Sequence, residues 1–197
     1  MQPLIGRRAF LRLAAGTVAA LQSASMPRAE PAGQATGTSR LVLLGTGGGP
    51  SPKPNRSASA QAIIVNGVTY LVDCGNGVGV QMTKAHIKFS SLRKIFITHL
   101  HSDHAADYGN VLLLGWATDL VTPVDTYGPP PLTHMTELFL EMNDVDIRTR
   151  MADEGRPPLA ELIHPHELTA PGLVMRDGNV TVTAALVDHP PIAPAFA

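Results

Sequence analysis

Residues 98–104 read "THLHSDH", which places three histidines and one aspartate within six positions, directly after the apolar run "KIFI". His99 and His101 are two residues apart, so on an extended segment their side chains leave the same face and can bind one ion together. Asp103 and His104 follow where the strand must turn, which suits a second ion about 3.5–4 Å from the first. Neutral imidazole with carboxylate suits zinc, and less specifically manganese or iron. The stretch therefore predicts a metal centre at the end of a strand.

The segments on either side of this stretch alternate between strand and helix patterns. Strands are predicted at residues 41–44 (buried), 62–65, 68–72, 92–98 and at the start of 123–132. Helices are predicted at residues 76–88, 107–120 and 133–145, the first capped by Asn76 and the last by Thr133. Asn66-Gly67 predicts a two-residue hairpin turn between the second and third strands. This order predicts an α/β sheet whose carboxyl edge, the usual place for a site, carries the histidine stretch.

The C-terminal part of the chain has weaker patterns. Residues 146–169 are polar, Pro-rich and aperiodic, which predicts a loop. Residues 172–189 predict a second hairpin that turns at residues 177–179. Its second strand is predicted to end on His189, so this histidine would also stand at a strand end.

Composition limits the classes of function. The chain has 197 residues, of which 44% are hydrophobic and 16% charged, enough apolar material for the core of one domain. The formal net charge is -1, so no global field would recruit nucleic acid or an anionic membrane surface. A single cysteine excludes an internal disulfide.

The N-terminus reads as a targeting signal. Two arginines and a weakly apolar segment in residues 1–29 resemble a twin-arginine export signal, followed by a Pro/Gly/Ala/Ser linker at residues 30–40. The apolar part, residues 13–24, is shorter than the roughly 20 residues of a stable membrane anchor. We therefore expect a periplasmic or secreted protein. An amphipathic basic helix is the alternative interpretation.

Several stretches together resemble the metallo-β-lactamase superfamily. They are "LLGTGGGPSPKPNRSASA", "YLVDCGNGV", "FITHLHSDHAADYGNVLLL", "TYGPPPL" and "LVDHPP", and the resemblance runs from about Leu41 to the end of the chain. Within the superfamily they are similar to the branch of tRNase Z and the arylsulfatase-like phosphodiesterases. The resemblance implies an α/β fold of the αβ/βα sandwich type over residues 41–197.

The resemblance also implies roles for particular residues. His99, His101 and His189 would bind the first metal ion, while Asp103 and His104 contribute to the second. Asp73 would support the metal-binding loop from behind the ligands. Two alternatives stay open: His189 as a surface residue at a strand end, and Asp73 as a residue that only forms a turn.

The implied chemistry is hydrolysis of a small anionic phosphodiester or sulfate ester by a hydroxide that bridges two ions, expected to be Zn²⁺ with Mn²⁺ or Fe²⁺ as alternatives. Asp103 would accept the proton of the attacking water and so be catalytic. The loop at residues 45–56 carries Lys53, Asn55 and Arg56, which would bind an anionic leaving group unless it is a plain surface loop. Export and the charge balance disfavour transfer RNA as the substrate.

Members of the superfamily continue into a second β/α half, which supplies an aspartate that bridges both metals and a last histidine. The chain stops eight residues after His189, so we expect only the N-terminal half to two-thirds of the fold, as a truncated product or a partial sequence. The alternative to an enzyme is a non-catalytic remnant that binds at most one metal. A further possibility for such a remnant is that it needs a partner, for example a second copy in a homodimer, to complete its sheet.

Overall fold

The computed structural model describes residues 37–197. The predicted export signal, residues 1–29, and most of the predicted linker lie outside the described residues, and the first strand begins at Ser39, inside the predicted linker. Within residues 37–197, no helix has the length and apolar character needed to cross a bilayer.

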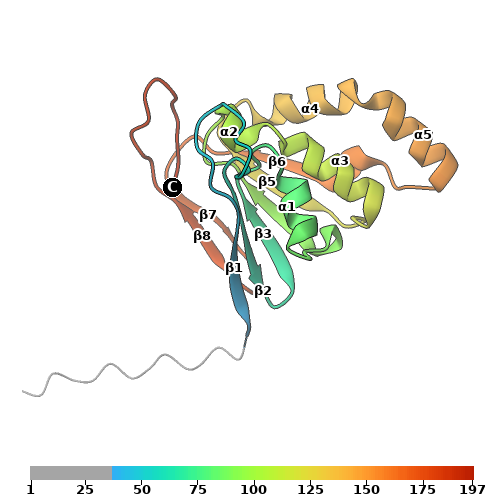
Figure 1. Ribbon diagram of the computed structural model, residues 1–197, viewed down its shortest axis with the longest axis horizontal. Helices are drawn as coiled ribbons and strands as arrows, with labels where there is room; N and C mark the ends of the chain where they lie inside the picture. Colours follow the sequence, from blue (N-terminus) through green and yellow to red (C-terminus); the bar gives the residue numbers. More distant parts are fainter. Residues whose placement is uncertain (1–36) are drawn as a thin grey trace, which may run out of the picture. The chain divides into compact units, whose positions relative to one another are not determined.

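A six-stranded mixed sheet forms the centre of the fold (Figure 1). Its strands lie in sequence order: β1 (Ser39–Gly45), β2 (Ala60–Val65), β3 (Val68–Val72), β4 (Leu92–Phe96), β5 (Val124–Gly128) and β6 (Ile163–Glu167). Strands β1 to β3 pair antiparallel, and β3 to β6 pair parallel. The parallel strands end at one edge, which is where the histidine stretch leaves β4.

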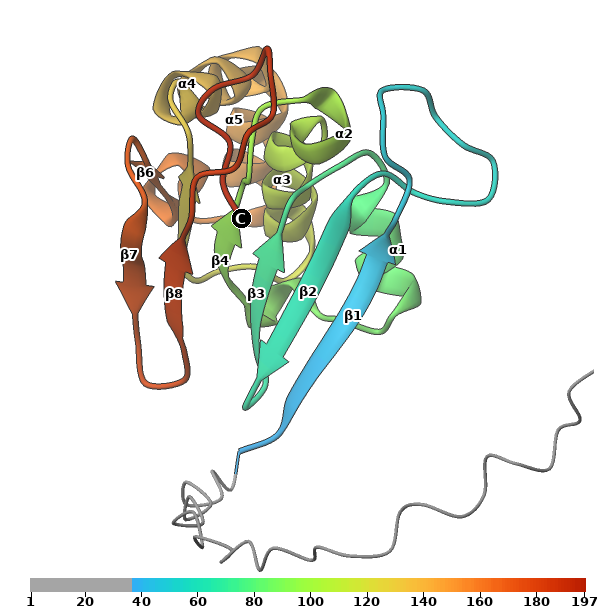
Figure 2. The ribbon, with the colours of Figure 1, turned by 90° about the vertical axis from the view of Figure 1, so that its left-hand side faces the viewer.

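Helices cover one face of this sheet, as Figures 1 and 2 both show. They are α1 (Val78–Lys84), α2 (Ser102–Ala105), α3 (Tyr108–Thr118), α4 (Leu132–Met142) and α5 (Asp144–Glu154), with short 3₁₀ turns η1 (Phe89–Ser91) and η2 (Leu159–Leu162). The core between helices and sheet includes the fully buried Leu71, Met82, Ile95 and Trp116. Removing this apolar surface from water is the main force that holds the helices on the sheet.

A second sheet of two strands lies on the opposite face of the main sheet (Figure 2). It consists of β7 (Gly172–Arg176) and β8 (Thr181–Ala184), which pair antiparallel. The Tyr70 hydroxyl on β3 donates a hydrogen bond of 2.7 Å to Asp177 in the turn between these strands. An apolar cavity of about 270 Å³ separates the two sheets, lined by residues that include Phe96, Tyr127 and Phe196.

The predicted α/β sheet and the first hairpin are confirmed. Asn66 and Gly67 both adopt positive φ, 51° and 80°, as a two-residue turn of this type requires. The prediction that residues 41–44 form a buried strand is wrong in one respect. Leu41 and Leu43 are 60% and 61% exposed, because β1 is an edge strand and these side chains point away from the helices.

The prediction of a loop at residues 146–169 is wrong. Helix α5 occupies its first part, supported by ion pairs one helical turn apart, such as Asp144–Arg148 at 2.6 Å and Arg150–Glu154 at 2.7 Å. Strand β6 occupies its last part and adds to β5 in parallel register. Both elements are largely exposed, so neither has the apolar periodicity that identifies a helix or strand in sequence.

Three predicted details of element ends are also wrong. Helix α1 begins at Val78 after Gly77, and α4 begins at Leu132 after Pro131, so neither Asn76 nor Thr133 acts as a side-chain cap. Strand β8 ends at Ala184, and His189 therefore lies in the segment that follows the strand.

Candidate metal centre

The histidine stretch leaves the sheet in an extended conformation and then turns into a helix. Strand β4 ends at Phe96, and α2 begins at Ser102 with His101 as its extended N-cap residue. The backbone N–H groups of His104 and Ala105 both donate to the His101 carbonyl, at 2.9 and 3.0 Å. This turn brings Asp103 and His104 back beside the extended part of the stretch.

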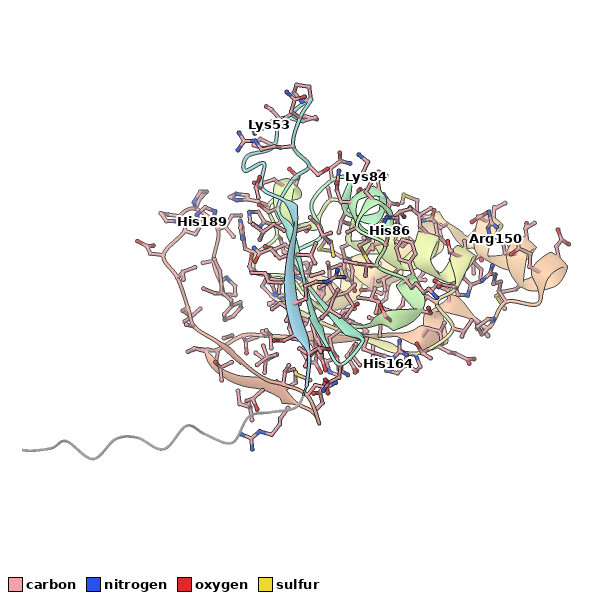
Figure 3. The ribbon with its side chains drawn as sticks, turned by 60° about the horizontal axis from the view of Figure 1, so that its bottom comes forward. Lys53, Lys84, His86, Arg150, His164 and His189 are labelled. Carbon is pink, nitrogen blue, oxygen red and sulfur yellow. The ribbon has the colours of Figure 1, made fainter. Side chains whose placement is uncertain are left out.

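Three imidazoles converge above the end of β4. His99, His101 and His189 each offer one nitrogen, and these nitrogens all lie within 4.8 Å of one another. His101 Nδ1 is 3.1 Å from His99 Nε2 and 3.1 Å from His189 Nε2. Figure 3 labels His189 on the segment that follows β8. The structure thus brings together the three residues for which the resemblance implies a first metal site.

The donor set fits a zinc ion. Zinc binds imidazole nitrogen at about 2.0–2.1 Å, which places two ligands of a tetrahedral site roughly 3.3 Å apart. The 3.1 Å separations are close to this value. Burial, followed by the nearby His104 and His189, lowers the pKa of His99, which favours the neutral imidazole that binds metal.

His189 reaches the others because the segment at residues 185–197 folds back on itself. Ala185 and Ala197 exchange two backbone hydrogen bonds of 2.8 and 2.9 Å, and the Phe196 N–H donates to the Thr98 carbonyl at 3.0 Å. Phe196 is buried. The last bond ties the segment that carries His189 directly to the residue that precedes His99.

Asp73 lies behind the histidines, almost fully buried at 3% exposure. Its carboxylate accepts hydrogen bonds from the Thr98 N–H at 2.9 Å, the Thr98 hydroxyl at 3.0 Å and His104 Nδ1 at 2.7 Å. Burial lowers the pKa of His104, but Asp73 and the nearby Asp103 raise it by more. A carboxylate that holds Nδ1–H leaves Nε2 of His104 free as a ligand.

Asp103 lies in α2, and its Oδ2 is 3.5 Å from His104 Nε2, the imidazole nitrogen that does not contact Asp73. The same oxygen accepts a hydrogen bond of 2.5 Å from the Gly49 N–H. Burial raises the pKa of Asp103, but this hydrogen bond and the neighbouring histidines hold it below its ordinary value. The backbone of Asp103 also packs directly against Gly75. A side chain at position 75 would prevent this, since a Cβ there would lie 2.2 Å from the Asp103 carbonyl oxygen.

The Gly/Pro-rich loop between β1 and β2 borders a cavity of about 140 Å³ beside Asp103. Lys53 and Arg56 line this cavity, while Asn55 is not among its lining residues. The Lys53 ammonium donates to the Gly48 carbonyl at 2.5 Å. Two of the three loop residues considered in the sequence thus line the same cavity as Asp103.

Sequence reasoning missed two contributors to the centre. The Thr98 hydroxyl lies 3.0 Å from both Asp73 Oδ1 and His99 Nδ1, so it links the carboxylate to a second imidazole. Thr98 stands inside the quoted stretch, but a threonine beside a histidine has no distinctive spacing. The Gly49 N–H is a backbone group, and only the run of glycines at residues 47–49 hints at it.

Sequence comparison finds relatives over most of the chain. Residues 39–112 match the family described as Anti-Pycsar protein Apyc1. Ribonuclease Z of Mycobacterium sp. (strain KMS) is 37% identical over 161 residues, which cover 79% of this chain and 55% of the relative. Ribonuclease Z of Mycobacterium marinum is 36% identical over 162 residues, with 79% and 56% covered. The chain therefore spans about half the length of the curated relatives it matches.

Solved structures share the fold. Human tRNase Z, short form, superposes with a TM-score of 0.63 at 26% identity, covering 81% of this chain and 63% of the human protein. The metallo-β-lactamase fold protein YhfI of Bacillus subtilis gives a TM-score of 0.54 at 19% identity, covering 80% and 56%, and supports the fold alone. Together with the histidine stretch, these likenesses show that the chain belongs to the metallo-β-lactamase superfamily, in the branch that contains ribonuclease Z.

Proposed function

We propose that this chain carries the zinc centre of a phosphodiester hydrolase. The observation that supports this most directly is the convergence of His99, His101 and His189 within 4.8 Å, in a chain 37% identical to a ribonuclease Z. A bound metal ion supplies an activated water and a Lewis acid for the phosphoryl oxygen. Zinc suits the imidazole ligands best, with manganese or iron as alternatives.

The protein's own groups would hold and orient the reactants. Asp103 is ionised at neutral pH, since its pKa is depressed, and its carboxylate would accept a hydrogen bond from the attacking water. His104, held by Asp73, would serve the second metal position. Lys53 and Arg56 face the adjacent cavity, where their positive charges would attract an anionic ester.

We propose a small phosphodiester as the substrate. A net charge of -1 gives no global attraction for RNA, and the N-terminal pattern supports export. A sulfate ester carries the same single negative charge as a phosphodiester and is the less supported option, because the relatives at 36–37% identity are ribonuclease Z proteins. The second candidate substrate is RNA, because the relatives at 36–37% identity are ribonuclease Z proteins.

A non-catalytic metal-binding chain is the alternative outside the enzymes. It is supported by the single group of three metal-binding side chains that meets within 4.8 Å among the described residues, His99, His101 and His189. In this case the three histidines would bind one ion, and the second position would stay without enough ligands.

The test combines metal content with turnover. Purified chain, without a histidine tag, would be assayed for zinc per chain and for hydrolysis of bis(p-nitrophenyl) phosphate, p-nitrophenyl sulfate and a precursor transfer RNA. His101→Ala should abolish both binding and turnover, while the exposed His86→Ala should change neither. Faster cleavage of the precursor RNA would favour the second substrate. Zinc binding without turnover on any substrate would favour the non-catalytic chain.

A further inference from the structure

A second pair of histidines lies on β6, away from the centre described above. His164 and His166 are two residues apart on one strand, so their side chains leave the same face of the sheet. Asp125 on β5 is the register partner of His164 and points to that same face. Two imidazoles and a carboxylate therefore meet across two neighbouring strands.

The carboxylate of Asp125 is shared between two kinds of neighbour. Its Oδ2 pairs with the Lys94 ammonium on β4. Its Oδ1 lies 2.9 Å from His166 Nε2 and 3.6 Å from His164 Nδ1. Burial raises the pKa of Asp125, but the bonds from Lys94 and His166 lower it below its ordinary value, so this group is ionised at neutral pH. Lys94 thus orients Oδ1 toward both imidazoles.

We propose that His164, His166 and Asp125 form a second binding site for a divalent transition metal, independent of the zinc centre. Figure 3 shows His164 and His189 at well-separated places on the molecule. The two sites share no residue, so one can be removed while the other remains. This inference does not depend on the hydrolase proposed above.

The three side chains are close to the geometry that a metal requires. The two distances from Asp125 Oδ1 bracket the roughly 3.3 Å that separates neighbouring ligands around a tetrahedral ion. The three ligand atoms do not all lie within 4.8 Å of one another, so one imidazole must rotate to complete the site. The His166 ring stacks on the Tyr127 ring, with the ring centroids 4.7 Å apart and an angle of 15° between the ring planes. His164 is half-exposed and is the side chain that would rotate, which would exchange the contact of 3.2 Å between its Nε2 and the Glu161 carbonyl for the metal.

The ligand types select the class of metal. Two imidazoles with one carboxylate suit Zn²⁺, Ni²⁺ and Cu²⁺, whereas Ca²⁺ and Mg²⁺ prefer sites made of oxygen ligands. Lys94 already neutralises part of the Asp125 charge, so affinity would come mainly from the imidazoles. Among divalent ions, nickel and copper bind such nitrogen sites more tightly than manganese or iron.

Nickel titration of the full chain tests this site. Calorimetry would use Ni²⁺ and untagged protein that carries His99→Ala and His101→Ala, which removes the first centre. We expect one Ni²⁺ per chain, and at least tenfold weaker binding when His166→Gln is added. The matched control is His86→Gln, an exposed histidine elsewhere, which should leave the affinity unchanged. Absence of Ni²⁺ binding, or equal loss with His86→Gln, would overturn the proposal.

A second measurement uses the unmutated chain and so does not depend on the folding of the variants. Diethyl pyrocarbonate modifies accessible imidazoles, and the modified residues can be identified by mass spectrometry. Ni²⁺ should slow the modification of His164 and His166 several-fold while His86 and His134 react as before. Equal modification rates of His164 and His166 with and without Ni²⁺ would refute the site.

Discussion

His104 Nδ1 lies 2.7 Å from Asp73 Oδ2, a contact that joins two segments 31 residues apart in the sequence. Asp73 adopts a positive φ of 61°, and its own N–H is bonded to the Phe96 carbonyl at 2.8 Å. An aspartate tolerates this conformation better than most side chains, yet it is uncommon. The turn in the backbone at Asp73 therefore directs its buried carboxylate toward Thr98 and His104 of the histidine stretch.

Replacing this carboxylate should weaken metal binding without unfolding the chain. Asp73→Asn keeps the shape of the side chain but removes the charge that holds the Nδ1–H of His104. Zinc affinity, measured by competition with a coloured chelator, should fall about 10- to 100-fold, as is typical when a group that orients a ligand is lost. Asp153→Asn, which changes an exposed carboxylate on α5, is the control. An affinity within twofold of the unmutated chain would show that Asp73 only forms a turn.

Thr98 should act in the same way on His99. The Thr98 hydroxyl lies 3.0 Å from Asp73 Oδ1 and 3.0 Å from His99 Nδ1. Thr98→Val leaves the imidazole N–H unsatisfied at a cost of about 1–3 kcal/mol, which corresponds to roughly fivefold to 150-fold weaker zinc binding. Thr98→Ser keeps the hydroxyl and should restore most of the affinity. If valine and serine bind zinc equally well, the hydroxyl does not position His99.

The parts of the fold that could be predicted have local signals. The hairpin at Asn66-Gly67 needs only two residues with positive φ, and the spacing of His99 and His101 fixes their common face whatever surrounds them. Helix α5 has no such signal, because Ile147 is its only buried residue. Its charged side chains pair along an exposed surface, and in sequence this pattern looks like a polar loop.

Long-range contacts explain what residue spacing alone could not predict about the site, where His189 was expected only from the family resemblance. The closeness of His189 to His101 depends on backbone bonds between residues at the two ends of its segment, and on the bond from Phe196 to Thr98. The Gly49 N–H reaches Asp103 across 54 residues. Backbone groups carry no residue-specific signature, so such contacts become visible only in three dimensions.

The export signal expected at residues 1–29 remains a prediction, and exchange of the arginine pair tests it. The test is the double substitution Arg7→Lys and Arg8→Lys, which keeps both positive charges but removes both guanidinium groups. If the pair acted through its charge alone, the substitution would have no effect. We expect the variant to accumulate in the cytoplasm and the unmutated chain in the periplasm or medium, as measured by fractionation and immunoblotting. Equal distribution of the two would contradict twin-arginine export and favour an amphipathic basic helix.

The bond between Tyr70 and Asp177 should make the attachment of the β7–β8 hairpin depend on pH. Burial raises the pKa of Asp177, but the Tyr70 hydroxyl and the N–H groups of Asn179 and Val180 lower it below its ordinary value of 3.8. A depressed pKa stabilises the folded state above pH 3.8, and this contribution is lost as the pH falls through the lower folded-state value. Tyr70→Phe removes the donor, so it should unfold at lower urea concentration than the unmutated chain at pH 6.

The two proteins should converge as the pH falls below 3.8, because a protonated Asp177 no longer draws the same benefit from the hydroxyl. The Tyr70 hydroxyl also accepts a hydrogen bond of 3.2 Å from the Asn179 amide, which does not titrate in this range. The histidines and the other carboxylates titrate alike in both chains, so the pH dependence of the difference between their urea midpoints isolates the contact with Asp177. Urea unfolding at several pH values between 3 and 6, in metal-free buffer, measures that difference. A constant difference across the whole range would mean that the Tyr70 hydroxyl stabilises the fold only through contacts that do not titrate, such as the hydrogen bond of 3.2 Å from Asn179, with no contribution from the charge of Asp177.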